Sequence, residues 1–451
     1  MAELRATYRL QLGPGLGFPE ARELVPYLRD LGVSHLYLSP SLEAREGSTH
    51  GYDVVDPTRL SEALGGEEEF RALCFAGQRH GLGVVLDIVP NHMATDEDAN
   101  PFWRDPLWRA KFFDVDWRTG AHRRFFDVGE LAGVRAEDPE VFEVTHRKVI
   151  DLVQEGLVDG VRIDHPDGLA NPRRYLERLE EAGIEHVWVE KILEPGERLR
   201  DWPVEGTTGY EFLNEALGVF VDPSAEEPLT ALYAELTGET RSFHEVADEC
   251  KLREARGTFA EDAERLAALL PEGLEVDLPA ALASLPVYRT YVEPDSGRVE
   301  DADRAAIEAA MLPQELQRLL LLEERGHDAL VVRFQQTTPP VHAKGVEDTA
   351  FYRWSRLVGL NEVGGDPGLL DEAGPEVMHA WAEHQQQHWP LGMTTLTTHD
   401  TKRSEDVLAF TRGAEVLVAV ALRGDVGGFR SSQGGWREVF RTETLLLAER
   451  E

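Results

Sequence analysis

The amino-acid sequence predicts an α/β protein, a (β/α)8 TIM barrel with helical insertions and a small C-terminal β-domain. Three observations indicate this class. Short apolar runs alternate with amphipathic stretches through the first half of the chain. The apolar runs are too hydrophobic to keep one face in water, which is typical of a parallel sheet covered by helices. The length of 451 residues also leaves room for a barrel of about 250 residues with additions.

Hydrophobic periodicity and helix boundary residues locate the individual elements. We expect strands at 6–12, 33–39, 83–89, 158–164 and 186–193, and helices at 19–31, 67–80, 139–155 and 172–182. Pro19 suits the first turn of the first helix, and Gly81 suits the end of the second. The order is strand, helix, strand throughout, as a barrel requires.

Later segments suggest insertions and a return to the barrel. The expected division is a first barrel part at 1–223 with a short insertion around 95–137, a helical insertion at 224–325, the last barrel part at 326–406, and a β-domain at 407–451. Strand-like runs at 329–334 (ALVVRF) and 393–398 (MTTLTT) would resume the barrel. The alternating stretch 407–423, with one or two strands in 436–451, would form the β-domain.

The amino-acid composition disfavours several classes of binding partner. Lys and Arg number 46 against 83 Asp and Glu, a formal charge of −37, which repels nucleic acid and anionic membranes. No run of about 18 apolar residues occurs and no charged-then-apolar leader opens the chain, so we expect a cytoplasmic protein without membrane contact. Cys74 and Cys250 are the only cysteines, which excludes a disulfide framework and a CxxC metal site.

Three carboxylates follow predicted strands. In the strand ending at Asp164, Arg162 and Asp164 share one face, because side chains alternate along a strand. Glu190 ends the next strand and shares a face with Trp188, and Asp400 follows a later strand-like run. Such positions face the C-terminal mouth of a barrel, where these folds keep their chemistry.

This set suits retaining cleavage of a glycosidic bond. That reaction needs an ionised carboxylate as nucleophile and a protonated one about 5–5.5 Å away as acid. Arg162 would keep Asp164 charged, while burial and acidic neighbours would raise the pKa of Glu190. A lone strand-end Asp is usually a cap or turn residue. Three carboxylates on successive strand ends, beside His92 and His399, favour a catalytic role over a structural one.

Four segments resemble, in order, the conserved blocks of the α-amylase superfamily, glycoside hydrolase family 13. They are DIVPNH (87–92), GVRIDH (160–165), VWVEKIL (187–193) and TTHD (397–400), and HGYDVVDP (50–57) also matches. The resemblance implies nucleophile, acid/base and transition-state stabiliser roles for Asp164, Glu190 and Asp400. It implies sugar binding by Tyr52, Asp53, His92, Arg162, His165, Lys191 and His399.

A longer segment, 334–367, is similar to a signature of the maltooligosyl trehalose synthase branch of this superfamily. The chain resembles a compact version of that branch. The segments 124–146, 156–172, 285–292 and 399–407 match it too. This branch is an isomerase, a (1→4)-α-D-glucan 1-α-D-glucosylmutase, which turns the reducing-end α-1,4 bond of a maltooligosaccharide into an α,α-1,1 bond. Lys344, Glu347 and Asp348 are candidates for holding the released glucose, although a structural salt-bridged turn explains each of them nearly as well.

The resemblance implies a maltooligosaccharide or glycogen-derived substrate, and a maltooligosyl trehalose trehalohydrolase that acts next. An α-glucan hydrolase, the trehalohydrolase itself and an inactive glucan-binding protein are the alternatives. No cofactor is expected. Asp87 and Asn91 stand where many amylases bind calcium, and their oxygens would suit it. We nevertheless expect no essential metal and a hydrogen-bonding role for Asn91.

Overall fold

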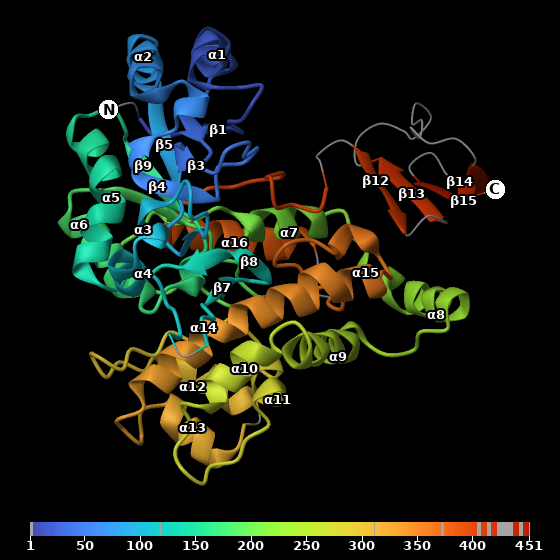
Figure 1. Cartoon of the computed structure of the whole chain (residues 1–451). Helices are drawn as coiled ribbons and strands as arrows, with labels where there is room; N and C mark the ends of the chain where they lie inside the picture. The colour runs from blue at the N-terminus through green and yellow to red at the C-terminus, as the bar shows by residue number, and fades with distance from the viewer. Residues whose placement is uncertain are drawn as a thin grey trace.

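A computed structural model describes residues 3–117, 119–310, 312–370 and 374–403 in full, and the backbone of four strands within 407–450. In this part of the chain six parallel strands form one curled sheet in the order β1-β2-β5-β9-β10-β11 (Figure 1). They are β1 (Thr7–Leu10), β2 (His35–Leu38), β5 (Gly83–Ile88), β9 (Gly160–Ile163), β10 (His186–Val189) and β11 (Gly206–Thr207). Five of them confirm the strands expected in the first half of the sequence.

Four helices cover the outer face of this sheet. They are α1 (Phe18–Leu31), α2 (Gly66–Arg79), α5 (Pro139–Gln154) and α6 (Pro172–Glu181), all within one or two residues of the expected bounds. Three of them have proline in the first turn, and the Asp138 side chain caps α5 by accepting hydrogen bonds from two backbone N–H groups. Their buried faces and the sheet share one hydrophobic core.

The two faces of the sheet differ as alternation predicts. Val161 and Ile163 belong to the core between sheet and helices. On the opposite, inner face, Trp188 packs with Tyr37 and Val85 in a separate cluster. Arg162 pairs in register with Trp188 and is fully buried, so the arginine before the nucleophile candidate lies inside the barrel.

Loops at the carboxyl ends of the strands form two small β-structures. One is the hairpin of β3 (Leu42–Ala44) and β4 (Val54–Leu60). The other is an antiparallel sheet of β6 (His92–Ala94), β8 (Val128–Gly133) and β7 (Arg124–Phe125), with the short helices α3 (Pro101–Arg104) and α4 (Pro106–Phe112) between β6 and β7. Of this second structure, α3, α4, β7 and β8 lie within 95–137, where the sequence predicts a short insertion, and β6 lies just before it.

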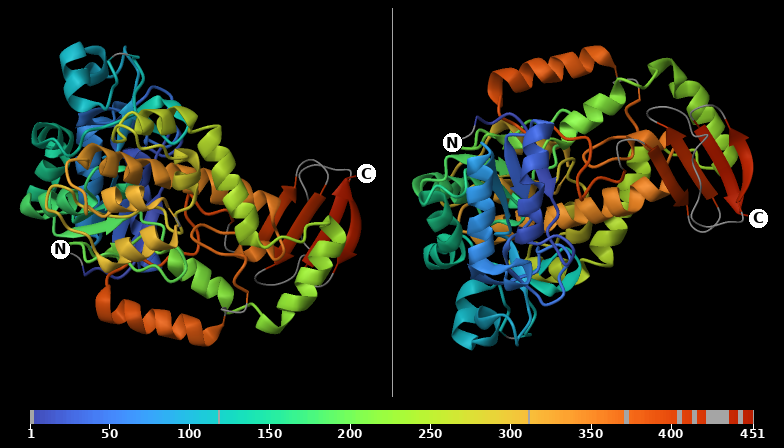
Figure 2. Two further views of the ribbon diagram at one scale, coloured as in Figure 1. Left: turned by 90° about the horizontal axis from the view of Figure 1, so that it is seen from below. Right: turned by 90° about the horizontal axis from the view of Figure 1, so that it is seen from above.

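Helices dominate the chain after β11. They are α7 (Tyr210–Gly218), α8 (Glu226–Thr237), α9 (Phe243–Arg256), α10 (Ala260–Ala267), α11 (Leu278–Ala283), α12 (Asp301–Ala309), α13 (Gln314–Leu320), α14 (Asp328–Gly345), α15 (Phe351–Arg353) and α16 (Pro375–His388). Helices α10–α13 gather at the bottom of Figure 1 around a second hydrophobic core. In Figure 2, α16 runs along the outer surface of the molecule.

The strand predicted at 329–334 is wrong, because these residues lie in α14. Leu330, Val331 and Phe334 are buried there at helical spacing, and α14 packs against α9 and α11. A short run of apolar, β-branched residues fits a buried strand or a buried helix equally well, and packing decides between them. The strand predicted at 393–398 is not formed either. Its first residue lies beside the sheet, where the Met393 N–H donates to the Thr207 carbonyl at 3.1 Å.

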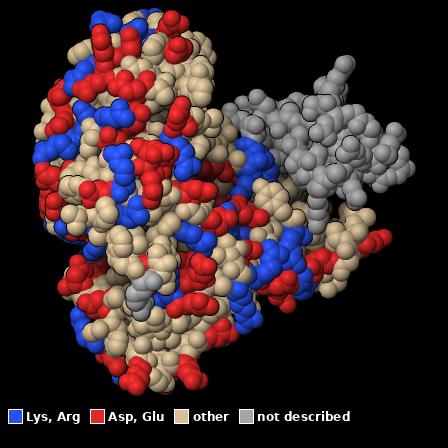
Figure 3. Space-filling view, in the orientation of Figure 1, with Lys and Arg blue, Asp and Glu red and all other residues tan. Residues whose placement is uncertain are grey.

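Near the C-terminus, four strands pair antiparallel in the order β12-β13-β15-β14. They are β12 (Val407–Arg412), β13 (Val416–Ala421), β14 (Trp436–Arg441) and β15 (Leu445–Arg450), in the segments where strands were expected. The predicted β-domain also includes 413–415, 422–435, 442–444 and 451, which lie outside the described residues. None of the helices described is both long and apolar enough to cross a lipid bilayer. Acidic side chains are spread over the face seen in Figure 3, with basic ones among them.

Candidate active site

A cavity of about 630 Å³ lies at the carboxyl ends of the parallel strands. It collects most of the residues that the sequence predicted for the site. Those lining it are Tyr52, His92, Asp164, His165, Glu190, Lys344, Glu347, Asp348, His399 and Asp400. They come from strand ends, from the loops after them and from the C-terminal end of α14, so segments far apart in the chain meet in one space.

The Arg162 guanidinium organises the acidic groups. Its Nη1 donates to Asp164 Oδ1 at 2.7 Å and to Asp87 Oδ1 at 2.8 Å, and its Nη2 lies 3.7 Å from Glu190 Oε2. The Arg162 side chain is 1% exposed. Asp164 and Glu190 therefore both lie within 4 Å of one guanidinium, which brings their carboxyl groups close together. Retaining glycosidases need a gap of about 5–5.5 Å.

Burial raises the pKa of both reactive carboxyls. The pKa of Glu190 is raised well above its ordinary value, first by desolvation, with the charges of Asp164 and Asp400 adding to it. Desolvation also raises the pKa of Asp164, to about 7, while the contact with Arg162 opposes the shift. Arg162 donates directly to Asp164 but lies farther from Glu190, so the guanidinium stabilises the ionised form of Asp164 more strongly. Such an asymmetry suits a nucleophile paired with an acid.

Tyr52 and His399 close one side of the cavity. The Tyr52 hydroxyl donates to Asp87 Oδ2 at 2.6 Å, and the His399 ring stacks on the Tyr52 ring with centroids 5.3 Å apart. His399 Nε2 also lies 3.1 Å from Asp400 Oδ2. The Tyr210 hydroxyl at the start of α7 donates to the same oxygen at 2.8 Å. These contacts hold Asp400 beside the other two carboxylates.

The placement of Asp400 depends on a close approach of two segments. Gly209 has φ 89°, and a Cβ there would lie 2.2 Å from the Met393 carbonyl oxygen. Only glycine tolerates this backbone conformation together with this contact. The segment leading to Asp400 therefore passes directly over the start of α7, within reach of Tyr210.

Two histidines face the cavity from opposite sides of an aromatic pair. His92 is fully buried and stacks on Phe125 at 3.9 Å, and neither ring nitrogen has a partner among the described residues. His165 adopts φ 42° and donates its backbone N–H to Glu190 Oε2 at 2.8 Å, while its ring meets Phe126 at 5.0 Å. Burial lowers the pKa of the His92 ring to about 3, so it is neutral and free to bond an uncharged hydroxyl.

The group at 344–348 lines the cavity and also forms ion pairs, so both sequence interpretations find support. Lys344 Nζ lies 3.1 Å from Asp127 Oδ1 and 3.2 Å from Asp348 Oδ2. Glu347 accepts a hydrogen bond from the Tyr288 hydroxyl. The strand predicted at 329–334 would have placed this group after a strand, but these residues are helical. The group lies at the end of α14 and in the π-helical turn Val346–Ala350, and such turns are frequent at functional sites.

Replacing Glu347 with Gln should flatten the dependence of stability on pH. Burial raises the pKa of Glu347 from 4.5 to about 7, so the folded chain holds a proton that the unfolded chain releases. Its stabilising contribution is complete below about pH 4.5 and is lost as the pH rises through about 7, by on the order of 2 kcal/mol. Urea unfolding at pH 5 and pH 8 measures this. The exposed Glu261→Gln should behave like the parent, and a parent that gains stability over this range contradicts the prediction.

Three predicted residues do not line the cavity: Asp53, Lys191 and Arg162, which is buried beside the carboxylates. Asp53 accepts a hydrogen bond from Ser48 Oγ at 2.5 Å. Lys191 is 1% exposed and lies 3.3 Å from Glu197 Oε2 and 3.6 Å from Asp167 Oδ2. Because Asp167 does line the cavity, the structure gives Lys191 a place behind its wall.

Other cavity residues were not singled out from the sequence. Phe125, Phe126, Tyr288 and Lys402 line it, and Asp87 anchors Arg162 and Tyr52 beneath it. The first two stand in a segment matched to the family, but two adjacent phenylalanines are more often core residues. The sequence indicates Asp87 only as a possible calcium ligand. Its pairing in register with Arg162 on the neighbouring strand β9 is the feature that connects it to the site.

Asn91 is one of the two residues that stand where many amylases bind calcium. Its Oδ1 accepts a hydrogen bond from Arg123 Nη1 at 2.8 Å, in a buried position. This is the structural hydrogen-bonding role expected from the sequence. Within the described residues, no group of three or more His, Cys, Asp or Glu side chains is placed to hold a metal ion.

The chain is similar to known proteins over most of its length. Residues 22–189 match the α-amylase catalytic domain. A Mycobacterium tuberculosis H37Rv protein named maltooligosyl trehalose synthase is 37% identical over 90% of this chain. The Arthrobacter ramosus maltooligosyltrehalose synthase structure is 39% identical over 89% of this chain, with a TM-score of 0.80. The structure of a hypothetical maltooligosyl trehalose synthase from Sulfolobus tokodaii is 32% identical over 89% of this chain, with a TM-score of 0.77.

These matches confirm the predicted (β/α)8 class, since they combine an α-amylase catalytic domain with close structural likeness over most of the chain. The chain spans 64% of the length of the curated relative and 63% of the length of each of the two solved structures.

Proposed function

We propose, from the premise that this chain is a homologue of the maltooligosyl trehalose synthases, that it is an isomerase acting on α-1,4-glucans. The reaction would convert the reducing-end α-1,4 bond of a maltooligosaccharide into an α,α-1,1 bond. The observation that carries the proposal is the meeting of Asp164 and Glu190 on one buried arginine in a cavity of about 630 Å³.

The first step forms a glycosyl-enzyme. The Asp164 carboxylate attacks the anomeric carbon of the penultimate glucosyl unit, and the bond from that carbon to the leaving oxygen breaks. Glu190 gives its proton to this oxygen, and free glucose is the leaving group. Asp400, held by Tyr210, is placed to support positive charge on the ring in the transition state. The unpaired ring nitrogens of His92 suit a hydroxyl of the same sugar.

The second step uses the retained glucose. Its anomeric hydroxyl loses a proton to Glu190 and attacks the glycosyl carbon, which breaks the ester to Asp164 and creates the 1,1 bond. The released glucose must reorient within the cavity before it can leave. The polar side chains of Lys344, Glu347 and Asp348 line the same cavity, and we assign them to holding it.

Product analysis with maltopentaose tests the proposal. The synthase activity predicts a non-reducing pentasaccharide with little free glucose, so reducing ends disappear while chain length is kept. A hydrolase would instead create new reducing ends and shorter chains. An inactive glucan-binding protein would leave maltopentaose unchanged. Either of the last two results refutes the proposal.

Phe125 and Phe126 are placed to keep water from the intermediate. They form an apolar wall against His92 and His165, and water would otherwise compete with glucose for the glycosyl-enzyme. We expect Phe126→Ala to raise the fraction of free glucose several-fold with little change in total turnover. The measurement is the ratio of glucose to non-reducing product from maltopentaose. The exposed Phe220→Ala serves as a control, and an unchanged ratio in Phe126→Ala contradicts the role.

Two further residues receive indirect roles. Lys191 would position Asp167 from behind the cavity wall, and Asp53 would hold the loop that carries Tyr52. These assignments take account of where both side chains lie and replace direct contact with the sugar.

The surrounding biology follows from the reaction. The product has a 1,1-linked disaccharide end, so a maltooligosyl trehalose trehalohydrolase would act next. The charge of −37 disfavours nucleic acid and anionic membranes as partners. Cys74 and Cys250 are both free and buried, which suits a reducing compartment such as the cytoplasm.

A further inference from the structure

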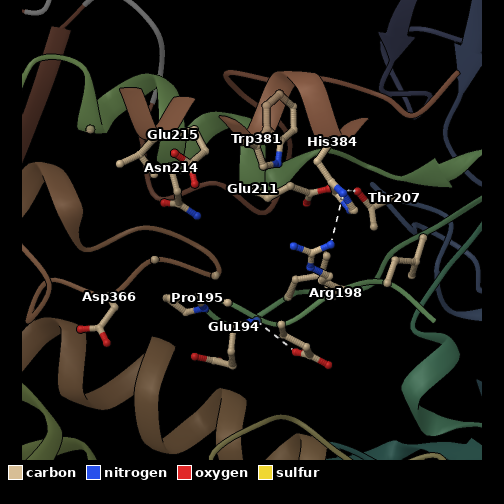
Figure 4. A pocket seen from close by; sticks show the side chains of 18 of the residues that line it. Glu194, Pro195, Arg198, Thr207, Glu211, Asn214, Glu215, Asp366, Trp381 and His384 are labelled. Carbon is tan, nitrogen blue, oxygen red and sulfur yellow. Dashed lines mark hydrogen bonds between the residues drawn. The ribbon is translucent and has the colours of Figure 1, made fainter. Parts of the chain in front are cut away.

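A second pocket, of about 270 Å³, lies outside the catalytic cavity and between helices α7 and α16 (Figure 4). The loop after β10 forms another side of it and contributes Arg198. Its volume is near the lower end for small-molecule sites, which run from about 300 Å³, and suits one sugar ring better than a chain. The reaction proposed above does not use this pocket.

A thin wall separates the two spaces. Ile192 and Val363 line the catalytic cavity, whereas the next residues of both segments, Leu193 and Gly364, line the second pocket. A Cβ at Gly364 would meet Ile192 Cγ2 at 3.1 Å, so the two segments pack tightly against each other. A ligand in the second pocket is therefore held apart from Asp164 and Glu190.

Helix α7 presents carboxylate oxygens to the pocket that accept no hydrogen bond. Glu211 and Glu215 are four residues apart on one face of this helix and both line the pocket. Glu211 Oε2 is buried and has no hydrogen-bond partner, while Glu211 Oε1 accepts a hydrogen bond from the Thr207 hydroxyl. Among the described residues the Glu215 carboxylate has neither a hydrogen bond nor an ion pair. Like charges at this spacing repel, and a buried acceptor without a partner is costly. A ligand rich in hydroxyl donors would relieve both costs.

The α16 side offers an aromatic face and polar groups. Trp381 and His384 lie three residues apart on one face of α16 and point into the pocket (Figure 4). Arg198 reaches across from the loop and lies 3.3 Å from His384 Nδ1. An indole facing carboxylates, with a guanidinium at the rim, matches a ring that has apolar faces and a polar edge.

Charge separates the possible ligand classes. Arg198 is the one Lys or Arg side chain among the lining residues described, and it forms no ion pair with the carboxylates of Glu211 and Glu215, which line the same pocket. An anionic ligand such as a phosphate would meet those carboxylates. A neutral polyhydroxyl compound satisfies acceptors and donors together without adding charge.

We propose that this pocket is a second, non-catalytic carbohydrate site that binds one glucosyl unit of an α-1,4-glucan. The choice of glucan rests on the proposed function, whereas the pocket and its chemistry stand independently of it. A second binding point would hold a long glucan on the enzyme while its reducing end enters the catalytic cavity.

Counting bound sugar tests the site. With radiolabelled maltotriose in equilibrium dialysis, the full chain carrying Asp164→Asn should bind two molecules, one in each pocket. Adding Trp381→Ala should leave one, and adding Glu215→Gln should weaken the second site at least about tenfold. Trp117→Ala, an exposed indole far from α16 in the sequence, should still bind two.

The outcomes are separable. One bound molecule in the Asp164→Asn chain, or two in the chain that also carries Trp381→Ala, overturns the proposal, as does binding of spermidine in place of maltotriose. If Trp381→Ala lowers the melting temperature, Trp381→Phe and Glu215→Gln decide the question, because both keep the shape of the pocket. Conversion of maltopentaose is measured separately, so failure of the proposed reaction and absence of the second site cannot be confused.

Discussion

Replacing Asp164 with Asn is expected to lower the turnover of maltooligosaccharides by roughly 10⁴-fold or more, since removing a nucleophile eliminates the covalent route. The amide keeps the size of the side chain, but it cannot attack the anomeric carbon. The measurement is the rate at which reducing ends disappear from maltopentaose. Sugar binding should persist, because His92, Tyr52 and Asp400 remain in place.

The matched control is Asp138→Asn. Asp138 caps α5, and asparagine caps a helix about as well as aspartate, so this variant should keep the parent's rate. If Asp164→Asn converted maltopentaose as fast as the parent, the chemistry would have to lie elsewhere, and a glucan-binding protein would be the better description.

Replacing Arg162 with Met is expected to cause the largest loss of stability, about 3–5 kcal/mol, because it removes the partner of buried charges. Asp87 and Asp164 both accept hydrogen bonds from this guanidinium, and their side chains are 0% and 9% exposed. The loss should be greater at pH 8 than at pH 5, since burial raises the pKa of Asp164 to about 7 and a protonated carboxyl needs no counter-charge. Urea unfolding at the two pH values measures both effects.

A surface arginine provides the comparison. Arg22 pairs with Glu69 at 2.7 Å, and both side chains are more than a third exposed, so Arg22→Met should cost no more than about 1 kcal/mol. Equal losses for the two variants would mean that Arg162 does not compensate buried charge.

Local patterns were enough to predict the first half of the barrel. Strands β2, β5 and β9 of the parallel sheet are buried along their whole length, and helices α1, α5 and α6 have proline in the first turn. The alternation of Arg162 and Asp164 against Val161 and Ile163 correctly gave the inward face, because side-chain direction along a strand is fixed by the backbone. The positions of Asp164 and Glu190 follow from the same alternation, whereas Asp400 rests on the resemblance at 397–400, because the strand predicted before it is not formed.

After β11 the same local patterns predicted the wrong element, because packing between helices decides the structure there. The residues 329–334 read as a strand, yet they form part of α14 because the second core accepts Leu330 and Phe334 on one helix face. This change moves Lys344, Glu347 and Asp348 to a helix end that closes the cavity. Pairwise contacts between distant segments, such as Gly209 with Met393, leave no trace in a local pattern.

The sequence by itself determined the class of fold, the inward-facing Arg162 and the strand-end carboxylates Asp164 and Glu190, since these depend on periodicity within single segments. Only the tertiary structure decided which groups share a space: Asp87 under Arg162, the aromatic wall over His92, Lys191 behind the cavity, and a second pocket between α7 and α16. Burial and the approach of distant segments set these relations, together with the pKa values of Asp164 and Glu190. Both arise only when the whole chain is packed.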